Sequence, residues 1–325
     1  MRAERTTWFW TLMVICPLVV GAGVFLGEGW RHPLSLLEPA HRGILAIRLW
    51  RVALGAMVGA SLAVSGAVLQ AVLRNPLAEP YVLGISSGAG LATALMIISG
   101  GMALGALALP AAGFVGAVAS LMAVYQLARV GRRTAPQTLI LAGVVWSSLC
   151  GSILMFLVSQ SSAEGLHAIL WWFLGDLQVF DTRLVGWAGG VVLFSLLACS
   201  FLAREMNVLV LGDEVAGHAG VDAEKTKIIL LALAALMTAA SVCVSGLIAF
   251  AGLTVPHAAR ALVGPEHRRL IIASAFLGAA FLVLADGLGR ALFYPVEVPV
   301  GVITAIVGGP FFLLLLRRKQ REIWT

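Results

Sequence analysis

The sequence predicts an all-α polytopic membrane protein with about ten transmembrane helices, from its composition, its apolar segments and an internal repeat. Of its 325 residues, 60% are hydrophobic and 12% are charged, whereas soluble domains carry about 25% charged residues. A soluble core could not hide this much apolar surface, so lipid must surround much of the chain. At about 20 residues a span, 325 residues leave room for about ten spans with short loops. We therefore expect a single transmembrane domain over 1–325. This excludes a soluble enzyme, a fibrous protein and a disordered regulator.

Nine apolar segments are long enough to be spans, and a tenth is short. The first, at 8–26, follows a charged N-terminus as in a signal peptide, but no convincing small-x-small cleavage site follows it, so we expect a span. The short span is expected at 256–266, where Pro256 should begin a helix because proline cannot continue one. The other eight cover 45–73, 84–99, 103–128, 138–159, 184–203, 227–251, 270–293 and 300–316.

The basic residues predict the orientation, because Lys and Arg gather at cytoplasmic helix ends. Three basic segments, 129–133, 204–227 and 317–321, are expected in the cytoplasm, together with Arg2 and Arg5. Both termini then share the cytoplasmic side, which requires an even number of spans. The net charge of +6 follows from these segments, so we expect no nucleic-acid partner.

An internal repeat relates 60–84 to 240–264, with ten of 25 positions identical. Five spans separate the copies, an odd number, so the copies should run in opposite directions. Inverted repeats with helices interrupted by Gly or Pro are typical of transporters. The predicted halves are 45–159 (spans 2–5) and 227–316 (spans 7–10). The predicted hinge of the repeat, where Gly or Pro would interrupt the helices, consists of Ser65, Gly66, Ser245, Gly246, Pro256 and His257.

The sequence carries no recognisable catalytic or nucleotide-binding motif. It has no GxxxxGK[ST], HExxH or GxSxG pattern and no paired carboxylates on an apolar span, and its four cysteines lack metal-site spacing. We therefore expect no enzyme activity, cofactor or metal in this chain. Asp286 and Arg290 lie four residues apart and should pair on one helix face. His257 is either a hydrogen-bonded structural residue or a ligand contact or proton relay.

Charge is scarce in the spans, although ion-driven transporters usually place ionisable groups along their path. A transporter of this kind must take its energy from a partner. The segment 204–226 is the longest cytoplasmic loop and contains Gly212, Gly217 and Gly220. We expect two short helices at a turn there, serving either as a docking platform or as a solvated connector.

Several motifs resemble those of FecCD-type permeases, the membrane subunits of ABC importers for iron-siderophores, haem and cobalamin. In the first half they are IRLWR at 47–51, GASLAVSGAVLQ at 59–70 and RNPLAEP at 74–80. The second half has FAGLTVPH at 250–257, and the loop has LGDEVAGHAGV at 211–221. The resemblance covers essentially the whole chain.

The resemblance implies a homodimer of ten-helix subunits in the cell inner membrane, with the translocation path along the dimer axis. Two copies of a cytoplasmic ATPase, which bind ATP and Mg, would dock on the loops at 204–226. A periplasmic or lipid-anchored substrate-binding protein would dock on the outer face. The expected cargo is a ferric siderophore first, with haem or cobalamin next.

The resemblance also implies roles for individual residues. Arg48, Arg51 and Arg290 would bind carboxylates of the binding protein, because guanidinium groups pair with them in bidentate fashion; interfacial snorkelling is the alternative for Arg48 and Arg51. The predicted translocation gates are Asn75, Pro76 and Leu77 and, in a second segment, Pro136, Gln137 and Thr138. The predicted ATPase-coupling residues are Leu211, Gly212, Asp213, Glu214, Ala216 and Gly220.

Two other kinds of function remain open on the sequence. One is an ion-coupled secondary transporter that works without an ATPase. The other is a polytopic membrane enzyme or a structural membrane subunit. Dependence of uptake on a partner ATPase distinguishes the first of these from an ABC importer.

Overall fold

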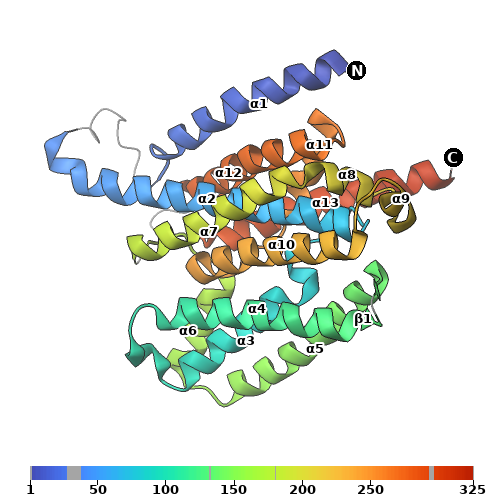
Figure 1. The fold of residues 1–325 in the computed structure, drawn as a ribbon. Coiled ribbons are helices and arrows are strands. Elements are labelled where there is room, and N and C mark those ends of the chain that lie inside the picture. The colour runs from blue at the N-terminus through green and yellow to red at the C-terminus, as the bar shows by residue number, and fades with distance from the viewer. Residues whose placement is uncertain (1, 28–37, 132, 180, 293–295, 325) are drawn as a thin grey trace.

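The computed structural model describes residues 2–27, 38–131, 133–179, 181–292 and 296–324, and most of this part is helical (Figure 1). The first α-helices are α1 (Arg2–Gly23), α2 (Arg42–Val72), α3 (Ile85–Ile98), α4 (Ala108–Ala128), α5 (Pro136–Ser159) and α6 (Ala163–Leu174). They are followed by α7 (Thr182–Phe201), α8 (Ala203–Leu209), α9 (Asp213–His218), α10 (Ala223–Ser245), α11 (Ala251–Val263), α12 (His267–Leu292) and α13 (Val300–Trp324). Short 3-10 turns lie at η2 (Pro39–His41), η3 (Pro80–Leu83) and η4 (Gly101–Leu104).

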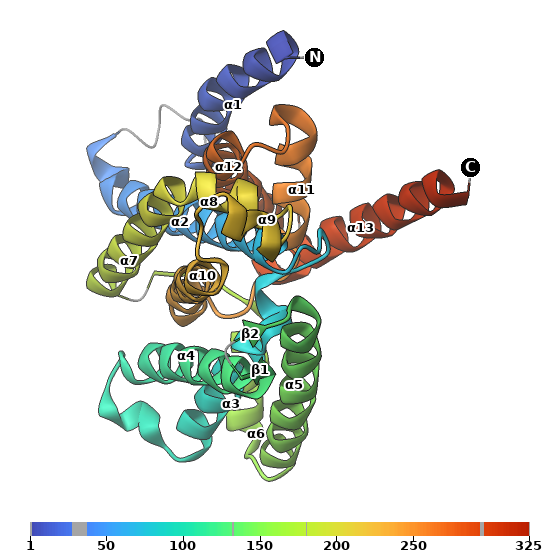
Figure 2. The same cartoon turned by 45° about the vertical axis from the view of Figure 1, so that its right-hand side comes forward.

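The helices form two groups that meet along α4 and α10 (Figure 2). In one group, α2 lies at the centre and contacts α7, α10, α11 and α12. The other group contains α3, α4, α5 and α6. A two-residue antiparallel pair, β1 (Arg129–Val130) with β2 (Arg133–Thr134), joins α4 to α5. In Figure 2, α13 extends away from both groups.

Helices α2 and α10 run in opposite directions along each other. Ser61 Oγ donates to Met237 O at 2.8 Å, and Ser65 Oγ donates to Ala234 O at 2.9 Å. Ser241 Oγ lies 2.8 Å from Ser61 Oγ. As the residue number rises on α2, it falls on α10, which is the relation expected if the repeat is inverted. The assignment of repeat halves stays a prediction.

Glycines allow close helix packing around α2. A Cβ on Gly59 would overlap the carbonyl of Gly278 on α12, and a Cβ on Gly66 would overlap the carbonyl of Gly252 on α11. Small residues at such crossings let helix backbones approach closely in membranes. The predicted break at Ser65 and Gly66 is therefore wrong, because α2 continues through them to Val72 and Gly66 serves packing instead.

The expected break in the second copy is present between α10 and α11. Gly246 ends α10 with φ +67°, and Phe250 precedes α11 with φ +67° as well. However, α11 begins at Ala251, so the prediction that Pro256 starts this helix is wrong. Pro256 cannot donate to the carbonyl of Gly252, and that carbonyl packs against α2.

The described helices include seven that are long and apolar enough to cross a membrane, namely α1, α2, α4, α5, α7, α10 and α12. Helix α3 and the 300–314 part of α13 are shorter apolar helices, and α11 has 13 residues. These elements match the predicted segments in order, while the count of ten spans stays a prediction. Helix α6, which has 12 residues and lies between two spans, was not predicted from the sequence.

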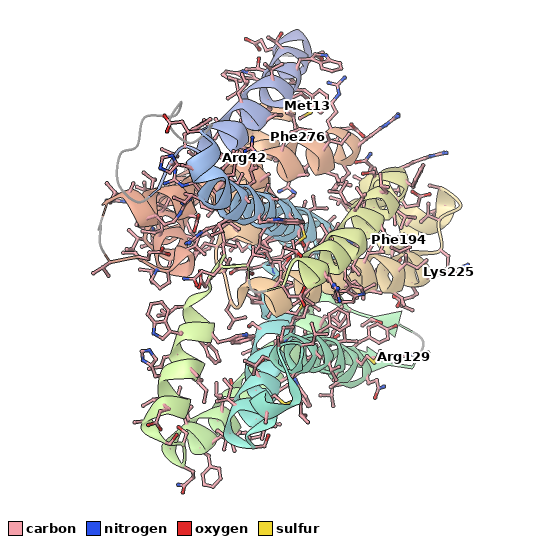
Figure 3. The ribbon with its side chains drawn as sticks, turned by 90° about the vertical axis from the view of Figure 1, so that its left-hand side faces the viewer. Met13, Arg42, Arg129, Phe194, Lys225 and Phe276 are labelled. Atoms are coloured by element: carbon pink, nitrogen blue, oxygen red, sulfur yellow. The ribbon has the colours of Figure 1, made fainter. Side chains whose placement is uncertain are left out.

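Both chain ends lie at the end of the molecule that carries α9 and the β1–β2 pair (Figure 1). This agrees with an even number of crossings. Apolar side chains cover the outside of the spanning helices; Phe194 on α7, for example, is 66% exposed (Figure 3). Met13 of α1 and Phe276 of α12 belong instead to one apolar cluster between these helices. Exposed apolar side chains of this kind suit a lipid surrounding.

Candidate functional site

Helix α9 forms a short exposed ridge within 204–226, which contains two short helices as predicted. Gly220 ends the ridge with φ +79°, and Val221 N donates to Ala216 O at 2.9 Å. This is the hydrogen bond of a Schellman C-cap, whose left-handed residue is most often glycine. Ala216 is buried beneath the ridge. The exposed residues at the ridge include Leu211, Asp213, Glu214, Val215, Gly217 and His218, and Gly212 precedes its helix.

Four charged residues form a cluster beneath the ridge, here named the α9 cluster: Arg74, Asp213, Glu224 and Lys227. Lys227 is buried, and its Nζ donates to Asp213 Oδ2 at 2.7 Å and to Glu224 Oε1 at 3.0 Å. Arg74 pairs with Asp213 Oδ1, and its Nε donates to Leu209 O at 2.9 Å. A buried ammonium group is stable only when it is paired. The cluster therefore holds α9 against α10 and against the segment that follows α2.

The α9 cluster is directly connected to the first predicted gate segment. Arg74, with φ +47°, immediately precedes Asn75. The side-chain oxygen of Asn75 accepts from Leu77 N at 3.0 Å, and its carbonyl accepts from Ala78 N at 3.0 Å. This Asx turn fixes the path of the backbone. A displacement of Asp213 would thus act through Arg74 on the segment 75–77.

The α9 cluster is also joined to the second predicted gate segment, through β2. Thr134 Oγ1 donates to Glu224 Oε2 at 3.1 Å, and Lys227 Nζ donates to Thr134 O at 3.4 Å. Two residues later, Pro136 begins α5. Thr138 Oγ1 donates to the carbonyl of Ala135 at 2.8 Å, which closes the first turn of α5, and Gln137 is exposed. The two gate segments lie on different elements, and each begins within two residues of a residue that is bonded in the same cluster, Arg74 or Thr134.

The first gate segment packs against the interrupted helix of the second half. Pro76, Leu77 and His257 line a cavity of only about 10 Å³. This is about the space that a single water requires, so these elements pack closely against one another. The structure therefore brings two predicted sets, the gate at 75–77 and the break at Pro256 and His257, to one place. The remaining lining residues are Leu253, Thr254, Phe311 and Phe312.

A second cluster, here named the α12 cluster, lies at the opposite end of α2 and consists of Arg51, Asp286, Arg290 and Glu297. Arg51 donates from Nη2 to Asp286 Oδ1 at 2.9 Å and to Glu297 Oε2 at 3.0 Å. Arg290 Nε donates to Asp286 Oδ2 at 3.0 Å. The predicted pairing of Asp286 with Arg290 is confirmed. Asp286 thus accepts hydrogen bonds from two guanidinium groups and links α2 to α12.

The three predicted docking arginines lie together, but they are buried. Arg48 Nη1 donates to Val24 O at 3.4 Å, and a Cβ on Gly27 would lie 3.4 Å from Arg48 Nη2. The residues Arg48 and Arg290 are 8% and 5% exposed, and the side chain of Arg51 is 12% exposed. Docking of a partner protein on these arginines stays a prediction.

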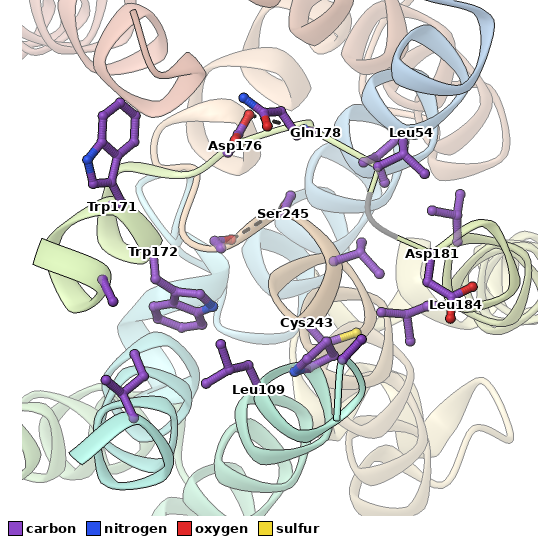
Figure 4. A pocket seen from close by; sticks show the side chains of 18 residues that line it. Leu54, Leu109, Trp171, Trp172, Asp176, Gln178, Asp181, Leu184, Cys243 and Ser245 are labelled. Carbon is purple, nitrogen blue, oxygen red and sulfur yellow. Dashed lines mark hydrogen bonds between the residues drawn. The ribbon is translucent and has the colours of Figure 1, made fainter. Parts of the chain in front are cut away.

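The predicted break at Ser245 and Gly246 borders a cavity of about 410 Å³ (Figure 4). Trp171 and Trp172 of α6 form part of its wall. Asp176 N donates to Ser245 O at 2.8 Å, so the α6–α7 connection is fastened to the end of α10. The helix break therefore borders a largely apolar space beside α6.

The sequence analysis missed Glu79 and the partners of Lys227. Glu79 Oε1 accepts from Phe250 N at 2.6 Å and thereby caps α11 from the segment after α2. One signal was available, because Glu79 is the lone charged residue between Arg74 and Arg129. For Lys227 the available signal was weak, because only Glu224 lies near it in the sequence, while Thr134 and Asp213 come from two other segments.

The charges around Asp213 determine its ionisation. Burial works to raise the pKa of this carboxyl, but the hydrogen bond and charge of Lys227 and the charge of Arg74 outweigh it and lower the pKa below its ordinary value. Asp213 is therefore ionised at neutral pH. Its ion pairs with Lys227 and Arg74 persist throughout the physiological range.

Comparison with known proteins identifies the family of this chain over most of its length. The model of the FecCD transport family matches residues 9–318. This chain belongs to the FecCD transport family. The chain is 45% identical over 284 residues to the cobalamin import system permease protein BtuC of Halobacterium salinarum, covering 87% of this chain and 75% of that one. It is 40% identical over 283 residues to the hemin transport system permease protein HmuU of Yersinia pestis, covering 86% and 84%.

A solved structure supports the family fold over almost the full length. It is described as an inward-facing conformation of a transporter assigned to the metal-chelate ABC type. Its TM-score is 0.84 at 28% identity, and the match covers 96% of this chain and 99% of that one. The chain is thus a multi-pass membrane permease, a transport subunit.

Proposed function

We propose that this chain is the membrane-spanning permease subunit of a binding-protein-dependent ABC importer for a metal chelate. The main observation behind the proposal is the α9 cluster. It connects an exposed ridge at one end of the molecule to Arg74 and Thr134, which precede the two predicted gate segments. A partner that moves the ridge would move Arg74 and Thr134 with it. An ion-coupled transporter, the alternative, would need no partner to move the ridge.

The proposed energy source is an ATPase bound to the ridge on the cytoplasmic side. Exposed Leu211 and Val215 offer an apolar contact, while Asp213 and Glu214 flank it with negative charge. Such a mixed surface on a short, well-capped helix suits a groove on a soluble partner. ATP and Mg would bind to two copies of that partner, and this chain would bind no cofactor.

The remaining partners follow from the family assembly. Two copies of this chain would form a homodimer in the cell inner membrane with both termini in the cytoplasm, and the path would run between the copies. A periplasmic or lipid-anchored binding protein would dock near Arg48, Arg51 and Arg290. Its carboxylates would compete with Asp286 and Glu297 for the same guanidinium groups.

The proposed cargo class is a metal held in a large organic ligand. Relatives carry names for cobalamin and hemin import, and a permease named for Fe(3+) dicitrate transport, FecD of Escherichia coli, is 38% identical over 90% of this chain. A ferric siderophore, haem and cobalamin all belong to this class. The identity of the cargo would depend chiefly on the binding protein.

Co-purification with the ATPase encoded beside this gene tests the proposal. Glu214→Lys reverses a charge on the ridge and should abolish the stable complex without loss of folded permease. Glu164→Lys is the matched control, because it makes the same change in the exposed first turn of α6. A complex that survives Glu214→Lys as well as it survives Glu164→Lys would contradict docking on the ridge.

A further inference from the structure

Two adjoining hollows lie at the α9 end of the molecule, on either side of Arg268. The first, of about 590 Å³, lies between α7, α8 and α12, and the second, of about 420 Å³, lies beside α1 and α12. Arg268, Glu266 and Ile272 line both. The lining of the first is completed by Ser200, Phe201, Ala203, Arg204 and Asn207, and that of the second by Phe9 and Arg269.

The charged side chains that line these hollows are mainly arginines, and no ion pair neutralises these arginines among the described residues. Arg204, Arg268 and Arg269 are all exposed. The acidic member of the lining, Glu266, already accepts from the backbone N–H groups of Arg268 at 2.9 Å and of Arg269 at 3.1 Å. Each hollow thus has two arginines and one carboxylate in its lining, and this excess of positive charge attracts an anion.

The walls of the first hollow are held in place. His267 N donates to Asn207 Oδ1 at 2.9 Å, and His267 Nδ1 lies 2.7 Å from the same oxygen. These contacts fasten α8 to the start of α12. The arginines on the two elements therefore face a preformed space, which reduces the ordering cost of binding.

The hollows lie at the level of a membrane surface. Arg204 follows the spanning helix α7 by three residues, and Arg268 begins the spanning helix α12. On the apolar side, Phe201 is exposed at the end of α7, and Trp8 and Trp10 are exposed on α1. Aromatic side chains gather at the interface between lipid tails and headgroups, so the arginines lie where phosphates of lipid headgroups are found.

We propose that the hollow between Arg204 and Arg268 binds the phosphate of an anionic phospholipid, with acyl chains along Phe201 and Ile272. Guanidinium groups bind phosphate oxygens in bidentate fashion, and basic pockets between helix ends bind lipid headgroups. The apolar wall next to the arginines favours a lipid over a free phosphate. This assignment needs only the membrane location of the chain and holds whatever the cargo is.

Native mass spectrometry of the full-length protein in detergent tests the site, with phosphatidylglycerol and phosphatidylcholine offered together. We expect the wild type to retain phosphatidylglycerol preferentially. Arg204→Gln and Arg268→Gln should each lower the retention ratio about 5-fold. Arg183→Gln is the matched control, because Arg183 is exposed at the opposite end of α7. Equal retention by the variants and the control would overturn the proposal.

Two further measurements distinguish a phospholipid from free phosphate as the ligand. Thermal unfolding with inorganic phosphate in place of lipid should show no stabilisation that depends on Arg268, because phosphate lacks the acyl chains. An equal stabilisation by phosphate would overturn the lipid assignment. Arg268→Lys should fold and keep part of the preference. If Arg268→Gln leaves lipid retention intact but removes the ATPase, the hollow is a protein contact and the proposal fails.

Discussion

The two ends of α2 carry ion-pair clusters of similar composition but different burial. Each cluster holds two basic and two acidic side chains. In the α12 cluster, the side chains of Asp286 and Arg290 are both 6% exposed. In the α9 cluster, Lys227 is 2% exposed but its partner Asp213 is 44% exposed. The central carboxylate of the α12 cluster is buried, with Glu297 30% exposed at the edge of that cluster, while Asp213 of the α9 cluster lies on a surface ridge.

Because of this difference, the ion pairs of the α12 cluster should be fixed, while those of the α9 cluster can rearrange. Removing one partner of a closed pair leaves a charge in a poorly solvating interior, which is costly. In the α9 cluster, water can solvate Asp213 when α9 moves, so its ion pairs can change at a lower cost. The clusters therefore suggest that α2 is anchored at the α12 end and is acted on at the α9 end.

Asp286→Asn is the change expected to have the largest effect. It leaves Arg51 with a single carboxylate, Glu297, and leaves Arg290 without its acidic partner, so we expect a loss of about 3–5 kcal/mol in the free energy of unfolding. Unfolding of the purified protein by SDS in mixed micelles would measure this loss. Glu297→Gln removes one more exposed partner and should cost about 1 kcal/mol or less. Equal losses would show that the α12 cluster is not organised around Asp286.

Asp213→Asn should have the smallest effect, and this effect should depend on pH. Because the pKa of Asp213 is lowered in the fold, its contribution to stability is complete above the unfolded pKa of about 3.9 and is lost as the pH falls through the lower folded value. Half exposure and solvent screening limit the contribution to about 1 kcal/mol or less. Melting temperatures of the wild type and the variant should differ constantly from pH 7 to pH 5 and converge below about pH 4. A difference that grows on acidification would contradict the ion pairing.

The sequence predicted the features that depend on local pattern. The order of the apolar helices, the two short helices in 204–226 and the pairing of Asp286 with Arg290 all follow from composition or from a four-residue spacing. The antiparallel course of α2 and α10 followed from the repeat, because five spans lie between its copies. These features could be read from segments of a few tens of residues.

The features that the sequence did not predict depend on contacts between distant segments. The motif at Ser65 and Gly66 is the same as at Ser245 and Gly246, yet α2 continues through the first while α10 ends at the second. Both glycines lie against a backbone carbonyl of another helix, Gly66 against Gly252 and Gly246 against Trp172, but only Gly246 has a positive φ, +67°. Similarly, the burial of Lys227 depends on Thr134, Asp213 and Glu224, and no short pattern in the chain joins these residues.

The central claim is that a partner ATPase drives transport through the α9 cluster. The most direct test measures uptake and ATP hydrolysis together in proteoliposomes that contain the permease, the ATPase and the binding protein. The probe is whichever of hemin, cobalamin or ferric dicitrate the binding protein retains. Lys227→Met breaks the cluster, while Lys225→Met makes the same change at an exposed position on α10.

We expect uptake to require ATP and to continue when ion gradients are collapsed. In Lys227→Met, uptake per ATP hydrolysed should fall roughly 5- to 30-fold, the factor that corresponds to 1–2 kcal/mol of coupling free energy, while hydrolysis continues. Lys225→Met should behave like the wild type. Uptake that proceeds without the ATPase and stops when an ion gradient collapses would contradict the account.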